Sequence, residues 1–346
     1  MVEILDCTIR DGSYVTGYNW EKQDLIDIVT VLSNSQIKFI EIGNGTGLGA
    51  YRNIVGALDD ESYIKTCVSH KGNSKIGAFF IPKIGNKEDI LKFCDLGGDF
   101  IRIGVNPNSE DLKNALEYIE FAKSKDLYVC VNLMKTYALS KYQFAEKCSV
   151  LQNYGIDCIY VVDSAGTMLP NQVAEYIRII KDLYNIELGF HGHNNLMLAN
   201  ANSLSAAENG AILVDSSLMS LGRGAGNAQT ESLVAILQKA NLLNKDIDII
   251  SLSDVGSSVI SKYLKRNQTL LKQDIMIGLA MFHDSNMNLV EKYAKEYNID
   301  SILLMKEVSK INIINPSEEL FKKVAERISN GDSINIFYPK FPHKDY

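Results

Sequence analysis

The feature that most constrains the fold is a regular alternation of short apolar runs with longer amphipathic stretches. Nearly continuous apolar runs of this kind are typical of parallel strands buried on both faces. They lie at 2–8, 38–43, 76–81, 100–105, 128–133, 158–163, 187–191 and 211–215. Helix-like stretches lie at 22–35, 87–96, 112–124, 141–154, 172–183, 196–208 and 229–239, and 50–69 is expected to hold a loop and one helix. Eight such units, in a segment close to the usual size of about 250 residues, predict a (β/α)8 TIM barrel.

A doubly wound open sheet is the alternative fold, but no GxGxxG motif follows the first apolar run. Beyond about residue 245 the pattern becomes helical only, with amphipathic stretches at 254–265, 289–297, 301–310 and 317–329. We therefore expect a barrel over residues 1–245 and a small all-helical C-terminal domain over residues 246–346.

Composition is that of an ordinary globular protein, with 46% hydrophobic and 22% charged residues. The net charge of −7 and the lack of a basic cluster argue against nucleic-acid binding. No apolar run approaches the length of a membrane span and the start does not have the form of a signal peptide, so we expect no membrane association. The six cysteines are scattered without a CxxC pair, which indicates reduced thiols and a cytoplasmic protein.

Candidate metal ligands follow the seventh apolar run, in the segment HGHNN at 191–195. His191 and His193 are two residues apart, and on a strand such residues point to the same side. Two imidazoles on one face form half of a divalent-metal site, or else a pair of polar histidines without a ligand role. The chain start favours the metal, because the first run also ends in polar residues, with Arg10 beside Asp11. In a barrel, residues at the C-terminal ends of strands are usually catalytic.

One carboxylate and two imidazoles leave open positions for a bidentate substrate on a divalent ion. Oxygen and nitrogen ligands without thiolate suit Mn²⁺ or Mg²⁺, and also Fe²⁺, Co²⁺ or Zn²⁺. A 2-oxo acid would chelate such an ion, which would act as a Lewis acid for the enolate. Arg10 is expected to hold the oxyanion, to pair with Glu41 or Asp163, or to do both. The glycine-rich loop 220–227 is expected to bind an anion through its N–H groups, with a tight turn as the alternative.

Five motifs taken together resemble a known superfamily. They are TIRDG at 8–12, IEIGNGTGLG at 40–49, VDSAGTMLP at 162–170, HGHNNLMLANANSL at 191–204 and GRGAGNAQTE at 222–231. In this order they resemble the metal-dependent pyruvate aldolases of the hydroxymethylglutaryl-CoA lyase-like barrel superfamily, and most of all its 4-hydroxy-2-oxovalerate aldolases. The resemblance covers the whole barrel. The stretch 275–312 resembles, more weakly, the helical communication domain of those aldolases.

The resemblance implies roles for individual residues. It implies a metal site formed by Asp11, His191 and His193, with a fourth ligand, as in the CoA-lyase branch, at Asn227. It implies that Arg10 is catalytic and stabilises the enolate. Two further residues are assigned to substrate binding: Ser164 lines the pocket for the substrate carboxylate, and Glu41 is the buried acid that helps hold Arg10.

The chain departs from these relatives at two places. The aldolases carry a histidine, the general base, three residues after the metal-binding aspartate, and this chain carries Tyr14 there. A tyrosine with its usual pKa near 10 is a poor base at neutral pH, so Tyr14, expected on a loop over the metal, is an acid, an activated base or a pocket wall. His70 and His283 are the candidates to replace the base. The CoA lyases carry a catalytic cysteine in the glycine loop, and 222–227 has none.

We therefore expect a divalent-metal aldolase that cleaves or forms a 4-hydroxy-2-oxo acid from pyruvate and an aldehyde. The alternatives are a Claisen-type acyltransferase that adds acetyl-CoA to a 2-oxo acid, and a non-catalytic partner subunit. The resemblance also implies a dehydrogenase partner that docks on the C-terminal domain, and we expect a homo-oligomer.

Overall fold

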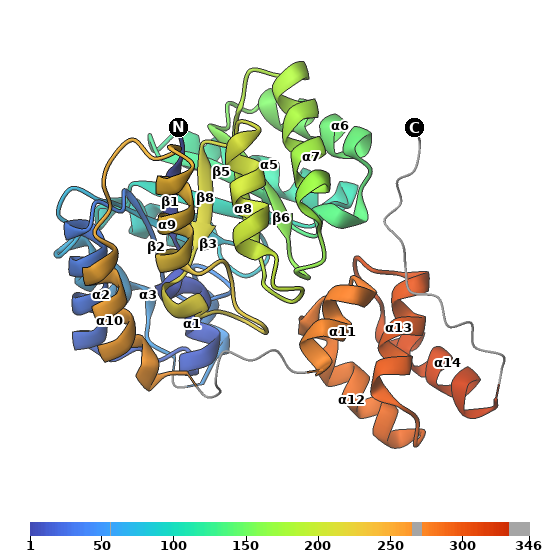
Figure 1. Ribbon diagram of the computed structural model, residues 1–346. Helices are drawn as coiled ribbons and strands as arrows, with labels where there is room; N and C mark the ends of the chain where they lie inside the picture. Colours follow the sequence, from blue (N-terminus) through green and yellow to red (C-terminus); the bar gives the residue numbers. More distant parts are fainter. Residues whose placement is uncertain (56, 265–271, 332–346) are drawn as a thin grey trace.

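The computed structural model describes residues 1–55, 57–264 and 272–331. Its centre is a closed barrel of eight parallel strands that pair in chain order, with β8 returning to β1. The strands are β1 Glu3–Asp6, β2 Phe39–Ile42, β3 Lys75–Phe80, β4 Phe100–Val105, β5 Tyr128–Leu133, β6 Cys158–Asp163, β7 Glu187–Gly192 and β8 Leu213–Ser216. The prediction of a (β/α)8 TIM barrel is confirmed (Figure 1).

Helices cover the outside of the barrel, because each turns an apolar stripe toward the strands. They are α2 Lys22–Asn34, α3 Asp60–Val68, α4 Lys87–Asp95, α5 Ser109–Lys123, α6 Lys141–Gln152, α7 Pro170–Leu183, α8 Ala199–Glu208 and α9 Thr230–Lys239. Asn86 and Ser140 form capping boxes at the starts of α4 and α6. Short 3-10 helices in the connections and C-terminal part are η1 Ala50–Asn53, η2 Thr136–Ala138, η3 Leu218–Ser220, η4 Ile260–Lys262 and η5 Asp284–Asn286.

The barrel interior is filled by large side chains that lie against glycines on neighbouring strands. A Cβ atom on Gly77 of β3 would lie 2.0 Å from the ring of Phe100, and one on Gly189 of β7 would lie 2.5 Å from the ring of Tyr160. Both rings are fully buried. This packing fills the interior of the barrel around β3, β4, β6 and β7, as is usual for TIM barrels.

A short helix, α1 Thr8–Thr16, follows β1 directly. The expectation of a loop at Tyr14 was therefore wrong. In a helix, residues three and four apart share a face, so Arg10 and Asp11 lie one turn before Tyr14. Gly12 lets α1 pack closely, since a Cβ there would lie 2.5 Å from Cδ2 of Leu221. Gly12 therefore allows a close contact between α1 and Leu221.

Helix α10 Ile249–Ser258 lies beyond residue 245, where we expected the helical domain to begin, yet it packs on the barrel. It contacts α2 and α9 (Figure 1). Its buried residues Leu252 and Val255 belong to the same hydrophobic core as the barrel helices. The packing favours a domain boundary after residue 264.

The remaining helices form a separate small unit with a hydrophobic core of its own. They are α11 Lys272–Ala280, α12 Met287–Glu296, α13 Ser301–Ile311 and α14 Glu318–Ser329. Phe282, Val290, Leu304 and Phe321 are buried at its centre. Within the described ranges, no helix is both long and apolar enough to cross a membrane.

Candidate active site

A cavity of about 590 Å³ opens at the C-terminal ends of the barrel strands, on the side that faces the helical unit. This is the face at which barrel enzymes carry their active sites. Both parts of the chain line it: Arg10, Asp11, Tyr14, Asn132, Lys135, Ser164, His191, His193 and Arg223 from the barrel, and His283, Asp284, Ser285, Asn288 and Asn315 from the helical unit. The helical unit therefore forms one wall of the cavity.

The two histidines of HGHNN lie together at the end of β7, with ring centroids 5.1 Å apart. Each ring uses Nδ1 for a protein contact: His191 Nδ1 lies 2.8 Å from Oδ2 of Asp215, and His193 Nδ1 lies 3.2 Å from the carbonyl oxygen of Gly226. An acceptor at Nδ1 fixes the tautomer and leaves Nε2 to bind a metal. Burial and the nearby Arg223 lower the pKa of His193 well below its usual range, so its ring stays neutral, as a ligand must.

Asp11 and Asn227 complete a set of oxygen and nitrogen donors beside these rings. Asn227 Nδ2 donates to Asp11 Oδ2 over 2.8 Å. Asn227 Oδ1 is buried and has no hydrogen-bond partner among the described residues, so this oxygen is available to bind a cation. Burial would raise the pKa of Asp11, but Arg10, both histidines and Arg223 lower it well below its usual range. The four residues therefore offer the kinds of oxygen and nitrogen donor that suit a divalent ion.

Arg223, in the glycine-rich loop, contacts this donor set. Its Nη2 lies 2.9 Å from Nε2 of His193 and donates to the carbonyl oxygen of Ser164 over 3.3 Å. Its other amino group pairs with Asp284 of the helical unit. An ion held by Nε2 of His193 would take the place of this guanidinium. The backbone N–H of Arg223 donates to Asp11 over 3.3 Å, so this part of the loop serves a protein carboxylate.

A different combination of groups, and not the set of Asp11, His191 and His193, has its ligand atoms close enough together among the described residues to hold a metal. The candidate ligand atoms of Cys7, His191 and Asp215 are all within 4.8 Å of one another. The Cys7 thiol, however, is fully buried and donates to the carbonyl of Ser216, and burial raises the pKa of Cys7 well above its usual range. A protonated thiol is a poor ligand. Asp215 is better understood as the carboxylate that orients His191.

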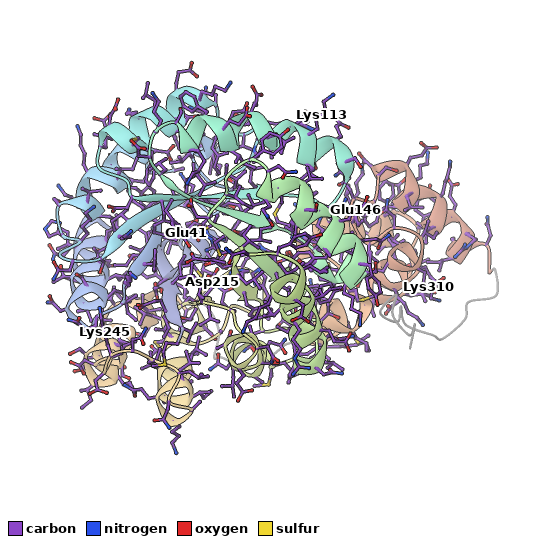
Figure 2. All side chains as sticks on the ribbon, turned by 90° about the horizontal axis from the view of Figure 1, so that it is seen from above. Glu41, Lys113, Glu146, Asp215, Lys245 and Lys310 are labelled. Carbon is purple, nitrogen blue, oxygen red and sulfur yellow. The ribbon has the colours of Figure 1, made fainter. Side chains whose placement is uncertain are left out.

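A buried chain of charges lies beneath the cavity and holds Arg10. Glu41 Oε2 accepts from Nε of Arg10 over 2.7 Å and from Nη1 of Arg102 over 3.1 Å. Arg102 also donates to Oδ2 of Asp215 over 2.5 Å, which in turn contacts His191. Figure 2 labels Glu41 and Asp215 in the middle of the barrel. Glu41 does not line the cavity, so it can serve substrate binding only through Arg10.

Sequence reasoning missed Arg102, which links Glu41, the partner of Arg10, to Asp215, the partner of His191. It is fully buried within β4 and its guanidinium lies 4.3 Å from the ring centroid of Tyr160. The sequence feature that could have identified it is the single charged residue inside the apolar run at 100–105. A buried charge must be paired, and here both of its partners lie on other strands, Glu41 on β2 and Asp215 on β8.

Tyr14 lies in the cavity wall, on the same helix as Asp11. Its ring packs over Gly45, where a Cβ atom would lie 2.2 Å from it. Burial raises the pKa of Tyr14 to about 12. The hydroxyl is therefore protonated at neutral pH, which suits a hydrogen-bond donor or an acid better than a base.

The two histidines considered as replacements for the base lie in different places. His70 lies at the end of α3, where its Nδ1 is 2.8 Å from the carbonyl of Thr66, and it does not line the cavity. His283 lines the cavity from the helical unit, with its Nδ1 2.7 Å from Oγ of Ser285. Burial, with the nearby charges of Arg223 and Lys135, lowers the pKa of His283 well below its usual range. The structure thus brings only His283 of this pair to the site.

Ser164 and Lys135 lie side by side in the wall formed by the ends of β5 and β6. The backbone N–H of Lys135 donates to Oγ of Ser164 over 3.0 Å. Lys135 was not singled out from the sequence, because its place depends on the β5 terminus and on a contact with the helical unit. Ser164 lies where the sequence motif suggested, in the lining of the cavity.

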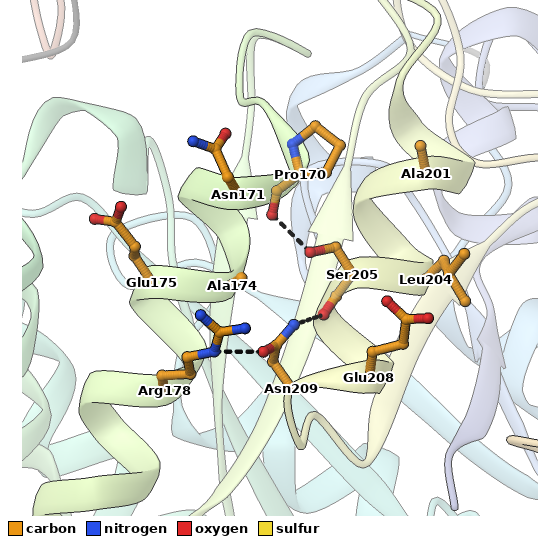
Figure 3. Close-up of a pocket in the computed structure, with 10 residues that line it drawn as sticks. All are labelled: Pro170, Asn171, Ala174, Glu175, Arg178, Ala201, Leu204, Ser205, Glu208 and Asn209. Carbon is orange, nitrogen blue, oxygen red and sulfur yellow. Dashed lines mark hydrogen bonds between the residues drawn. The ribbon is translucent and has the colours of Figure 1, made fainter.

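A second hollow, of about 480 Å³, lies between α7 and α8 on the outer face of the barrel (Figure 3). Its polar groups largely satisfy one another: Arg178 donates to Asn209, which donates to the carbonyl of Ser205, and the Ser205 hydroxyl donates to the carbonyl of Pro170. It contains no group directed at the metal donors. It is a groove between packed helices.

The barrel and the polar cavity at the C-terminal ends of its strands are typical of barrel enzymes, and sequence comparison identifies the family. Residues 1–259 match the HMGL-like family model. The chain therefore belongs to the HMGL-like family. The prediction of an aldolase-type enzyme of this superfamily is confirmed.

Individual relatives narrow the class. A 4-hydroxy-2-oxovalerate aldolase from Bacillus thuringiensis is 31% identical over 330 residues, which are 95% of this chain and 96% of that protein. Among solved structures, the HMG-CoA lyase of Bacillus subtilis has a TM-score of 0.66 at 18% identity and covers 80% of this chain and 97% of its own. The carboxyl transferase domain of Rhizobium etli pyruvate carboxylase has a TM-score of 0.77 at 14% identity, covering 95% of this chain and 61% of that chain. The two structures support the fold alone.

Proposed function

We propose that this protein is a divalent-metal-dependent aldolase that forms or cleaves 4-hydroxy-2-oxo acids from pyruvate and an aldehyde. The observation that carries the proposal is the donor set of Asp11, His191 and His193 beside the unpartnered Oδ1 of Asn227, with Arg10 at the same cavity. Oxygen and nitrogen donors of this kind suit Mn²⁺ or Mg²⁺. A bound ion would act as a Lewis acid toward the carboxylate and keto oxygens of a 2-oxo acid.

Arg10 is proposed to stabilise the enolate oxygen of pyruvate. Its Nε and Nη1 donate to Glu41 and Asp11, which fixes the plane of the guanidinium. Its Nη2 has no partner among the described residues and belongs to a side chain that lines the cavity. A donor that is already positioned needs little reorganisation when negative charge develops on the substrate oxygen. Ser164, in the opposite wall, is proposed to bind the substrate carboxylate.

At the aldehyde end, Tyr14 and His283 are the proposed proton-handling groups. During cleavage the 4-hydroxyl must lose a proton while the C3–C4 bond breaks, and during condensation the aldehyde oxygen must gain one. Tyr14 lines the cavity from α1, and His283 lines it from the helical unit. Tyr14, with its pKa raised to about 12, is proposed to donate to the aldehyde-derived oxygen. His283, whose ring is neutral, is proposed to exchange the proton.

Fewer observations support the remaining proposals, which concern the alternative reaction, the location and the partners. A Claisen acyltransferase remains the second candidate for the chemistry, since a metal-bound 2-oxo acid suits it too. A cytoplasmic location is proposed from the six unpaired cysteines. A dehydrogenase partner and a homo-oligomer are proposed from the similarity of the whole chain to 4-hydroxy-2-oxovalerate aldolases.

The test is a product assay with pyruvate, Mn²⁺ or Mg²⁺ and a panel of aldehydes, followed by NMR. We expect a 4-hydroxy-2-oxo acid that forms only with the metal and not after chelation. A parallel reaction with acetyl-CoA and 2-oxo acids should release no free thiol. Thiol release without aldol product would favour the acyltransferase, and neither product would favour a non-catalytic subunit.

A further inference from the structure

Lys135 is a buried cation on the side of the cavity remote from the first strand. It follows β5, and β5 lies opposite β1 because the eight strands close in chain order. Only 7% of the residue is exposed, yet it lines the cavity. Asp11 follows β1, so Lys135 lies across the cavity mouth from the carboxylate of the proposed metal site.

The carboxylates of the cavity already have cationic partners, and none of them is Lys135. Asp11 pairs with Arg10, and Asp284 pairs with Arg223. The side chain of Lys135 donates to a neutral group, the backbone carbonyl of Ile314 in the helical unit. Within the described part of the chain, no carboxylate lies within salt-bridge distance of its ammonium group.

A buried ammonium group with no carboxylate in contact is costly, and a bound anion would offset that cost. Burial and the nearby positive charge of Arg223 lower the pKa of Lys135 to about 8, and the smaller effect of Asp111, which is not in salt-bridge contact, acts in the opposite direction. Amide side chains surround the same region, since Asn106 from the end of β4 and Asn315, next to Ile314, also line the cavity. An ammonium group among amides suits a carboxylate or a phosphate.

We propose that Lys135 forms a second anion subsite, and that the aldehyde substrate carries a carboxylate or phosphate group at the end remote from its carbonyl. This inference rests on the proposed aldolase function and names the class of its second substrate. Pyruvate lies between Arg10 and Ser164, beside Asp11, while the ammonium group of Lys135 reaches away from Ser164 to the carbonyl of Ile314 in the helical unit. The aldehyde then extends toward β5, where its charged end meets Lys135.

The experiment compares matched aldehydes in the condensation with pyruvate. Succinic semialdehyde is paired with butanal, and glyceraldehyde 3-phosphate with glyceraldehyde, so that each pair differs mainly in the anionic group. For the wild-type enzyme, kcat/KM for the charged member of one pair should exceed that for its neutral partner by about 10-fold or more. The pair that shows the preference distinguishes a carboxylate from a phosphate.

Variants of Lys135 test its part in that preference. Lys135→Met should lower kcat/KM for the charged aldehyde by about 10- to 100-fold, the scale of one charged hydrogen bond, and should lower it less for the neutral one. Lys135→Arg, which keeps the charge, should retain a preference for the charged aldehyde. Lys113→Met is the control, since Lys113 is exposed on α5 at the periphery of the molecule (Figure 2).

Two outcomes would overturn the proposal. The first is a wild-type enzyme that uses both members of each pair equally well or prefers the neutral ones, which decides the question even if a variant fails to fold. The second is a Lys135→Met enzyme that loses charged and neutral aldehydes alike, which would make Lys135 a clamp on Ile314. Exchange of the pyruvate methyl protons distinguishes a failure of the subsite proposal from a failure of the aldolase proposal. If the protons exchange but the enzyme shows no preference for charged aldehydes, only the subsite is rejected. If no exchange occurs with any metal, the aldolase function itself is rejected.

Discussion

Tyr14 stands where related aldolases carry their base, and its surroundings favour the protonated phenol. Burial raises its pKa to about 12, so deprotonation begins only at pH values above the working range of most enzymes. A hydroxyl in this state can donate a hydrogen bond to the aldehyde oxygen throughout the neutral range. The substitution therefore changes the chemistry expected at this position from that of a base to that of a donor.

Replacing Tyr14 with phenylalanine removes the hydroxyl and keeps the ring over Gly45. We expect turnover to fall by about 10²- to 10⁴-fold, the range of one proton-transferring group. Metal content should not change. Because the raised pKa of Tyr14 leaves it protonated below about pH 11, the variant should keep the shape of the wild-type pH profile between pH 6 and about pH 9. Wild-type turnover in the variant, measured by steady-state kinetics, would make Tyr14 a pocket wall.

Single substitutions of His283 and His70 form a matched test, because His283 lines the cavity and His70 does not. His283→Ala removes a ring from the cavity, and we expect turnover to drop by at least about 10-fold. His70→Ala removes a ring whose hydrogen bonds, among the described residues, go to the end of its own helix, and turnover should stay within about twofold of the parent. Circular dichroism checks the fold of both variants. Equal activity of the His283 variant and the parent would assign proton exchange to Tyr14 or to water.

At the scale of single elements, helix α1 determines the geometry of the site, since it carries Arg10, Asp11 and Tyr14. Its packing depends on Gly12, which touches Leu221 in the segment that leads into the glycine-rich loop. That loop holds Asn227, whose amide lies 2.8 Å from Asp11. The spacing of the metal donors therefore depends on one close helix–loop contact.

Gly12→Ala tests this dependence. The added methyl group would lie 2.5 Å from Leu221, and we expect a loss of about 1–3 kcal/mol of stability, the cost of overpacking, together with weaker metal binding. Adding Leu221→Ala removes the clashing side chain and should restore part of both losses in a double-mutant cycle. Chemical denaturation and metal titration measure the two effects. Additive losses would show that the contact does not couple the two elements.

The strands, the helices and the residues of the cavity differ in how well the sequence predicts them. Strands β4, β5 and β6 have the predicted bounds, because a continuous apolar run between polar turns leaves little choice. Helix α1 was missed, since nine residues with a central glycine carry little helical signal. The motifs at strand ends could place Asp11, His191 and His193 at one end of the barrel, and their role as metal ligands stays a prediction. Arg102, Lys135 and the cavity wall around His283 could not be predicted, because their roles arise from contacts between segments far apart in sequence.

At the scale of the whole molecule, the helical unit completes the cavity and reaches the metal donors through one ion pair. Asp284 holds Arg223, and the same guanidinium contacts Nε2 of His193. A metal at His193 must displace that contact, and Asp284 offers the guanidinium an alternative partner. The helical unit is thereby linked to metal binding in the barrel.

Asp284→Asn should therefore weaken metal binding, because Arg223 loses the carboxylate that draws it away from His193. We expect the dissociation constant for Mn²⁺, measured by EPR titration, to rise by about 10-fold, the effect of one ion pair in a partly buried place. Glu296→Gln, on the exposed face of α12, is the control and should bind like the parent. Unchanged or tighter Mn²⁺ binding in Asp284→Asn would contradict this link.

The central claim is that the metal donors and Arg10 together convert pyruvate to its enolate. The most direct test is exchange of the pyruvate methyl protons in D₂O, followed by NMR with Mg²⁺ and without any aldehyde. We predict exchange that requires the metal, is lost on chelation and in His191→Ala, and slows by at least about 10²-fold in Arg10→Lys while the metal stays bound. Exchange that persists without metal, or that runs at the parental rate in Arg10→Lys, would contradict the account.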